Sequence, residues 1–225
     1  MVDRIRFSII DESNRHDHSH LRPDDACYHL FEYTSHRDFS FSATNNLIAN
    51  LKKKPSRAAQ PGYWHKNRVI GECSQHFRDA LNPNWLAQAT LVPVPGSKAV
   101  DHADFDDRIE RICRGISNPL PDVRALVRQR ESTQAAHEAA EGQRITVAEL
   151  IDLYEIDETK IAPPPTAIGI VDDVLTAGTH YRAMHTVLHA RFPNVPILGL
   201  FVARRIFPPI AELDDFDDLD DLPPL

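Results

Sequence analysis

The sequence has few cysteines, and their spacing matches no common framework. Cys27, Cys73 and Cys113 are the only three among 225 residues, and no C-x-x-C pair occurs. Disulfide-stapled domains and zinc ribbons both depend on more closely grouped cysteines. Their separation therefore argues against both kinds of site and predicts reduced thiols in the cytosol.

The sequence also lacks any long apolar run. No stretch approaches the roughly 18 residues of a membrane span, and the N-terminal residues lack a secretory pattern. The hydrophobic fraction of 42% and the charged fraction of 26% are ordinary for globular proteins. We expect a cytoplasmic protein without a membrane partner, with either one α/β domain or a core carrying an appended subdomain.

An excess of basic residues is absent as well. The formal net charge is −8, but residues 212–221 hold seven acidic residues and no basic one. Setting these seven aside leaves a net charge of −1, so the overall charge does not support a nucleic-acid partner.

The C-terminal residues 209–225 form an acidic tail in which apolar residues recur at three-residue spacing. We expect this tail to be disordered and solubilising. Two alternatives are a helical face that binds a protein partner, and docking of the acids on the basic stretch 52–68. That basic stretch contains Tyr63 and Trp64, so it predicts either a solvated loop or a nucleic-acid contact.

The most informative stretch covers residues 166–180 and reads T-A-I-G-I-V-D-D-V-L-T-A-G-T-H. Its apolar run predicts a strand buried on both faces of a parallel sheet. We expect the strand to end at Asp172 and Asp173, where it meets water. A tight turn over residues 176–179 follows, and then the three-to-four spacing of a helix.

This order of elements predicts a binding site for a sugar phosphate. Backbone N–H groups at the turn and at the helix N-terminus favour a phosphate, and Gly178 permits close approach of the backbone. Thr176 and Thr179 add hydroxyl donors. Asp172 and Asp173 suit the vicinal hydroxyls of a ribose, or a cation. The alternative is an ordinary strand-to-helix turn with an acidic edge.

The run I-G-I-V-D-D-V-L-T-A-G-T resembles the phosphoribosyl-pyrophosphate (PRPP) signature of type I phosphoribosyltransferases, including the orotate-phosphoribosyltransferase-like motif. The apolar strand, acidic pair, two apolar residues and T-x-G turn match over a dozen positions. The resemblance implies an α/β fold with a three-layer parallel-sheet core, and PRPP bound with Mg²⁺. Asp172 and Asp173 would hold the ribose hydroxyls, directly or through the metal. The implied PRPP-binding residues here are Asp172, Asp173, Val174, Leu175, Thr176, Ala177, Gly178 and Thr179.

A second predicted strand, T-L-V-P-V-P over residues 90–95, leads into Gly96, Ser97 and Lys98. A glycine, backbone donors, a hydroxyl and an ammonium at one strand end suit an anion. The segment resembles the pyrophosphate loop of the same family, and V-P-V-P is most like its ComF-like branch. The alternative is a proline-terminated strand.

The arginine-rich stretch 123–144 resembles the basic segment of the ComF-like branch. The resemblance gives Arg128 and Arg130 a catalytic role beside Asp172 and Asp173, on a mobile loop that closes over the departing pyrophosphate. The alternative is an exposed helix with charge pairs. The R-G-F-N element and the zinc module of that branch are absent; D-F-D-D-R stands at the comparable place.

The segment H-D-H-S-H contains His16, His18 and His20. Imidazoles two residues apart on an extended segment can share a face and bind a metal. Because no further ligand cluster is evident, a polar loop is the favoured alternative.

Other patterns predict the remaining elements. Short strands are expected over residues 4–10, 26–34 and 197–202. Helices are expected from Phe41 to Pro55 with Ser42 or Thr44 as the cap, and over residues 69–81, 104–114 and 146–154.

These predictions divide the chain into an N-terminal α+β extension packed on the core (1–85), a phosphoribosyltransferase-like core (86–208) and the acidic tail (209–225). The expected function is binding of PRPP and Mg²⁺, with transfer of the phosphoribosyl group to an acceptor, favoured to be a nucleobase. No base-recognition element is evident. The alternative is a non-enzymatic PRPP or nucleotide sensor, or a ComF-like nucleic-acid-associated module. A homodimer is compatible with the sequence.

Overall fold

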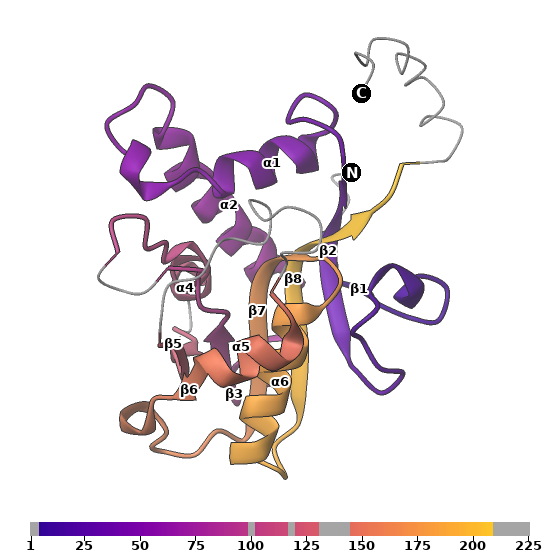
Figure 1. The fold of residues 1–225 in the computed structure, drawn as a ribbon, viewed down its shortest axis with the longest axis vertical. Helices are drawn as coiled ribbons and strands as arrows, with labels where there is room; N and C mark the ends of the chain where they lie inside the picture. The colour runs from indigo at the N-terminus through magenta and orange to yellow at the C-terminus, as the bar shows by residue number, and fades with distance from the viewer. Residues whose placement is uncertain (1–4, 99–101, 117–119, 131–144, 209–225) are drawn as a thin grey trace, which may run out of the picture.

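A six-stranded sheet organises the protein (Figure 1). The computed structural model describes residues 5–98, 102–116, 120–130 and 145–208. The strand order is β1-β2-β8-β7-β3-β4, and only β1 is antiparallel to its neighbour. The bounds are β1 Ser8–Ile9, β2 Cys27–Thr34, β3 Ala89–Pro93, β4 Asp122–Val123, β7 Ala167–Leu175 and β8 Ile197–Ile206. This confirms the predicted α/β class with a mostly parallel sheet.

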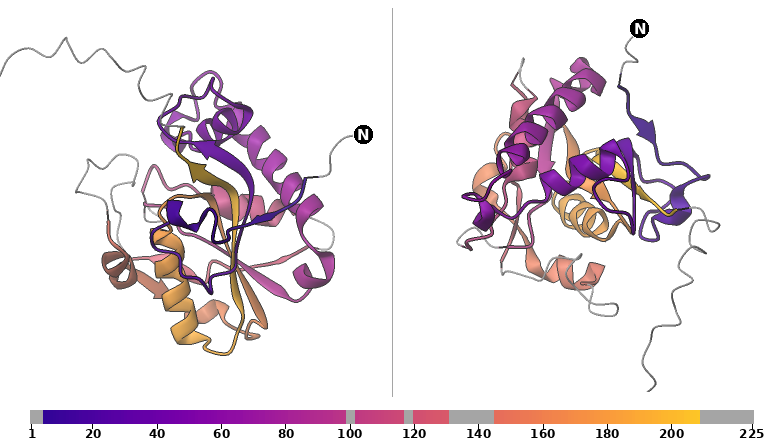
Figure 2. Two further views of the ribbon diagram at one scale, coloured as in Figure 1. Left: turned by 90° about the vertical axis from the view of Figure 1, so that its right-hand side faces the viewer. Right: turned by 90° about the horizontal axis from the view of Figure 1, so that it is seen from above.

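Helices cover both faces of this sheet, as Figure 2 shows. On one face, α1 (Ala43–Leu51), α2 (Trp64–Ala80) and α4 (Arg108–Gly115) enclose one apolar core with the strands. On the other, α5 (Val147–Leu153) and α6 (Thr179–Arg191) enclose a second core. Because β3 and β7 are covered on both sides, their sequences are almost continuously apolar, as expected of parallel strands.

The smaller elements complete the fold. The strands β5 (Val127–Gln129) and β6 (Tyr154–Ile156) form a separate antiparallel pair. The short helices are α3 (Pro83–Leu86) and the 3₁₀ turns Arg15–Asp17, Pro55–Arg57 and Glu158–Lys160. Within the described ranges, no helix has the length and apolar character needed to cross a bilayer.

The N-terminal residues contribute to the central sheet. Both strands predicted there are present, as β1 and β2, and they pair with each other. β2 also runs parallel to β8, from the pair Cys27 and Gly199 to the pair Thr34 and Ile206. The segment expected as an extension of the core thus forms one edge of the same sheet.

Capping residues explain the helix ends that the sequence predicted well. The Ser42 hydroxyl accepts the Asn45 N–H at 3.0 Å and starts α1, as predicted. Thr146 and Glu149 form a reciprocal capping box that starts α5.

Two helices begin elsewhere than predicted. α2 starts at Trp64 rather than at residue 69. The apolar pattern missed this start because the buried residue of the first turn is a lysine, Lys66. α4 starts at Arg108 rather than at residue 104. The Asp106 carboxylate accepts the Arg108 backbone N–H at 3.1 Å and keeps the preceding residues in a loop.

The chain leaves β3 and β7 in opposite directions. After β3 it passes through α4 to β4 on one side, whereas after β7 it passes through α6 to β8 on the other. Ligands of open parallel sheets bind where the strand order diverges in this way, outside the carboxyl ends of the strands. A ligand site is therefore expected at the carboxyl ends of β3 and β7.

Candidate functional site

The acidic pair lies inside β7 rather than at its end. The strand was expected to stop at Asp172 and Asp173, but pairing with β8 continues through Leu175 and Arg204, so the prediction of the strand end was wrong. Neighbouring residues of a strand point to opposite faces. Asp173 accordingly meets residues of α1 and α4, whereas Asp172 lies on the α6 side.

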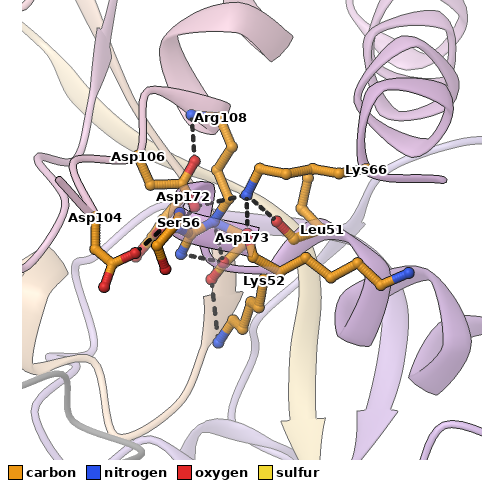
Figure 3. Close-up of polar contacts among 10 residues, drawn as sticks. Leu51, Lys52, Ser56, Lys66, Asp104, Asp106, Arg108, Asp172 and Asp173 are labelled. Atoms are coloured by element: carbon orange, nitrogen blue, oxygen red, sulfur yellow. Dashed lines mark hydrogen bonds and ion pairs between the residues drawn. The ribbon is translucent and has the colours of Figure 1, made fainter. Parts of the chain in front are cut away.

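Asp173 is held by two cations (Figure 3). Arg108 donates from Nε and Nη2 to Asp173 Oδ2 at 3.0 and 2.7 Å, and Lys52 Nζ lies 3.6 Å from Oδ1. Burial alone would raise the pKa of Asp173, but Lys52 and Arg108 hold it below its ordinary value. Asp173 is therefore ionised, and both of its oxygens face a cation.

Asp172 has a different environment. It is partly exposed, and its Oδ1 accepts the backbone N–H of Asp173 at 2.8 Å. Burial, followed by the charge of Asp173, raises the pKa of Asp172 to about 7. Of the two carboxylates, Asp172 is thus the one with oxygen atoms left for a ligand.

The turn after β7 has the form of an anion site. Gly178 adopts the left-handed conformation, with φ of 87°, at the N-cap of α6. Within the described part of the chain, the backbone N–H groups of Thr176, Ala177, Gly178 and Thr179 donate to no hydrogen bond. Unbonded N–H groups at a helix N-terminus, reinforced by the helix dipole, favour a phosphate.

The N-terminal residues fix the shape of this turn, which the sequence did not indicate. The His18 ring Nδ1 is hydrogen-bonded to the Thr176 carbonyl, and the His20 N–H donates to the Ala177 carbonyl at 2.9 Å. Leu21 packs on Gly178 so closely that an added Cβ would lie 3.2 Å from its side chain. These contacts occupy carbonyl oxygens of the turn and leave its N–H groups open.

The H-D-H-S-H segment is therefore a structural loop. Among the residues with described positions, no group of three His, Cys, Asp or Glu side chains is placed to hold a metal ion. His18 is buried at the turn while His16 is exposed. The metal-site interpretation of His16, His18 and His20 finds no support, and the polar-loop alternative describes the segment better.

The predicted pyrophosphate loop lies beside the acidic pair. The Val94 N–H donates to the Val171 carbonyl at 2.9 Å, so residues 95–98 leave the sheet next to Asp172. A Cβ added to Gly96 would lie 3.3 Å from the Asp106 carbonyl oxygen, so the loop closely approaches the segment before α4. Ser97 is tied to β5 through the Gln129 side chain, which donates to its carbonyl at 3.3 Å. Lys98 follows it.

Arg128 and Arg130 are not on a helix, so the exposed-helix alternative is wrong at these positions. Arg128 lies on β5, and both guanidinium groups pair with the single carboxylate of Glu155, from Arg130 Nε at 3.1 Å. Both arginine side chains remain more than half exposed. The rest of the predicted closing loop, 131–144, lies outside the described residues.

Sequence reasoning missed the cations around Asp173. The D-F-D-D-R segment, noted only as a departure from the ComF-like pattern, supplies Asp106 and Arg108. Arg108 Nη1 donates to Asp106 Oδ2 at 2.8 Å, and Lys66 Nζ donates to the same oxygen at 2.7 Å. The alternation of acids and arginine before a helix was a usable signal, but nothing local pointed to Lys52 or Lys66.

The oxygen donors can be tested against the expected Mg²⁺. This ion keeps several waters and is usually bound by one or two carboxylates together with phosphate oxygens. Asp172 fits that role because no cation of the described residues forms an ion pair with its carboxylate. Asp173 fits it poorly while Arg108 and Lys52 lie on its carboxylate. The residues suit a metal that arrives with a phosphorylated ligand.

No protein-family model matches the chain, and no curated protein is significantly similar to it.

Proposed function

We propose that this protein binds PRPP together with Mg²⁺ at the carboxyl ends of β3 and β7, as a phosphoribosyltransferase-like protein. One observation carries the proposal: two loops suited to anions follow neighbouring strands at the point where the chain diverges, and the acidic pair lies between them. PRPP has a phosphate at one end, a pyrophosphate at the other and two ribose hydroxyls in the middle. The two anion loops correspond to the two phosphorylated ends of PRPP, and the acidic pair between them corresponds to the ribose hydroxyls.

In this proposal the open N–H groups of residues 176–179 bind the 5-phosphate, and the loop of residues 96–98 binds the pyrophosphate. Asp172 takes the ribose hydroxyls or the metal. Bound Mg²⁺ would neutralise part of the pyrophosphate charge. Asp173 holds Arg108 and Lys52 at the edge of the site. The resemblance gave both aspartates to the ribose and the metal. The proposal keeps that role for Asp172 alone, and Asp173 instead positions the two cations.

Transfer would break the bond between the ribose C1 carbon and the pyrophosphate oxygen, and the electron pair would leave with pyrophosphate. A bond from C1 to a nitrogen of the acceptor, favoured to be a nucleobase, would form as that nitrogen loses its proton. Because the ribose becomes cationic, positioning and charge stabilisation supply most of the catalysis. Arg128 and Arg130 share one carboxylate, so positive charge remains near Ser97 for the leaving group. A cytoplasmic location, which the three separated cysteines favour, belongs to the same proposal.

Isothermal titration of the whole chain with PRPP and Mg²⁺ tests the binding. We expect saturable binding in the wild type and at least about tenfold weaker binding in Asp172→Asn, a loss of about 1.4 kcal/mol. Asp152→Asn removes an exposed charge on α5 and should bind as the wild type does. Absence of heat with folded wild-type protein at millimolar PRPP would disprove the proposal.

A second assay separates transfer from binding alone. Release of pyrophosphate from PRPP is measured with each common nucleobase as the acceptor. Release with any base identifies an enzyme. Binding without release under all conditions identifies a PRPP sensor on the same site.

A further inference from the structure

Lys52 stands out because it is the loosest member of an otherwise tight network. Every other ion pair of the network falls between 2.7 and 2.8 Å, whereas Lys52 Nζ lies 3.6 Å from Asp173 Oδ1. That distance exceeds the roughly 2.7–3.2 Å of a good hydrogen bond. The Lys52 side chain is 31% exposed, so its ammonium is at the boundary between the network and solvent.

The backbone of Lys52, in contrast, is firmly placed. Lys66 is fully buried, with 1% of its side chain exposed. Its ammonium donates to the carbonyls of Leu51 and Lys53 at 2.8 and 2.7 Å (Figure 3). These two residues flank Lys52. Its third bond goes to Asp106. Lys66 thus connects the C-terminal end of α1 to Asp106, which lies just before α4.

The same segment connects Lys52 to the predicted pyrophosphate loop. Asp106 binds Lys66 through its carboxylate and closely approaches Gly96 through its carbonyl. Arg108 bridges Asp106 and Asp173. Lys52 therefore lies on the α1 and α4 side of the acidic pair. The phosphate turn of residues 176–179, in contrast, continues into α6 on the opposite side of the sheet.

We infer that Lys52 is a ligand-binding residue whose ammonium contacts the pyrophosphate group, with Lys66 as its positioning residue. This inference rests on the proposed function and assigns to that site a cation from outside the strands. A bound pyrophosphate offers Lys52 an anion without the competition that it meets at Asp173, where Arg108 already holds one oxygen. A solvent-accessible ammonium on a fixed backbone can move to that ligand at low cost.

The test compares Lys52→Met, Lys52→Arg and Lys54→Met in the full chain. Lys54 is the matched control, because it lies two residues further along the same loop after α1 and is exposed. Binding of inorganic pyrophosphate with Mg²⁺, and of ribose 5-phosphate separately, is measured by titration calorimetry. Unfolding by urea shows that each variant is folded.

We expect Lys52→Met to weaken pyrophosphate binding at least about tenfold and ribose 5-phosphate binding less than about twofold. Lys52→Arg should recover most of the affinity, and Lys54→Met should match the wild type. The inference is overturned if Lys52→Met binds pyrophosphate as the wild type does, if Lys54→Met weakens it equally, or if the wild type binds no pyrophosphate. Pyrophosphate binding that depends on Lys52, in a wild type that binds neither ribose 5-phosphate nor PRPP, would support the inference and reject the proposed function.

Discussion

At the scale of single residues, the buried lysine is the most unusual feature. A lysine is almost never fully buried unless its charge is paired. Lys66 satisfies all three ammonium donors, on two backbone carbonyls and the Asp106 carboxylate. Burial lowers the pKa of Lys66, and the bonds and charge of Asp106 oppose that shift. The charge is retained because every donor has an acceptor.

Removal of this ammonium should therefore be costly. Lys66→Met leaves two carbonyls and part of the Asp106 carboxylate without their donor. We expect the free energy of unfolding to fall by about 3 kcal/mol, measured by urea denaturation. Lys54→Met, at an exposed position between α1 and α2, should change it by less than about 0.5 kcal/mol. A loss below about 1 kcal/mol for Lys66→Met would show that the network does not depend on this charge.

Asp172 should make stability depend on pH. Its folded pKa is raised, so the folded state holds the proton more tightly than the unfolded state does. Its contribution is complete below its ordinary pKa and is lost as the pH rises through about 7. Asp172→Asn removes that loss, so its stability relative to wild type should be higher at about pH 8 than at about pH 5. Between about pH 5 and the folded pKa of about 7, the difference grows by about 1.4 kcal/mol for each pH unit.

Urea unfolding of both proteins across that range measures this difference. The comparison cancels the contribution of His18, His29, His180 and His185, which both chains share and whose lowered pKa values act in the opposite direction. A difference that does not change with pH would contradict the raised pKa of Asp172.

At the scale of elements, two glycines with different surroundings give opposite predictions. Gly178→Ala forces a side chain into the left-handed region and against Leu21, so we expect a loss of about 1–2 kcal/mol and weaker PRPP binding. Gly71 lies within α2 with nothing near its added Cβ, so Gly71→Ala should gain about 0.5–1 kcal/mol. Urea unfolding checks both. Equal effects would mean that helix propensity, rather than the turn, decides stability at these positions.

Element by element, the sequence predicted what local patterns control. The apolar runs identified β3, β7 and β8, and the caps at Ser42 and Thr146 marked two helix starts. The end of β7 was misjudged because a strand continues for as long as its neighbour pairs with it, whatever the polarity of its residues. The start of α2 was missed because a lysine occupies its first buried position.

The candidate site was predictable only in part, for a related reason. The acidic pair, the T-x-G turn and the P-G-S-K loop are each a short continuous motif. The structure brings them together at the carboxyl ends of β3 and β7. The Arg108 and Lys52 contacts join residues far apart along the chain, as do those of His18 with the turn. No periodicity or motif in a single sequence encodes such pairings.

At the scale of the whole molecule, the N-terminal strand β2 and the last strand, β8, depend on each other. β2 pairs with β8, and α1 and α2 cover one face of the sheet that β3, β7 and β8 form. We expect a fragment of residues 86–225 to show no cooperative urea transition, whereas the full chain unfolds in one. Circular dichroism and fluorescence measure both transitions. Cooperative unfolding of the fragment would mean that residues 1–85 form a separable domain.

The pairing of β2 with β8 also sets an order of events during synthesis. Cys27 must wait for Gly199, about 170 residues later, before its parallel partner exists. At about 5–20 residues per second, the edge of β2 is unpaired for roughly 10–35 s on the ribosome. The loop of residues 18–21, which precedes β2, likewise meets the turn of residues 176–179 only after α6 has emerged. The nascent chain therefore carries an exposed strand edge for most of its synthesis, and its candidate site is one of the last parts to be assembled.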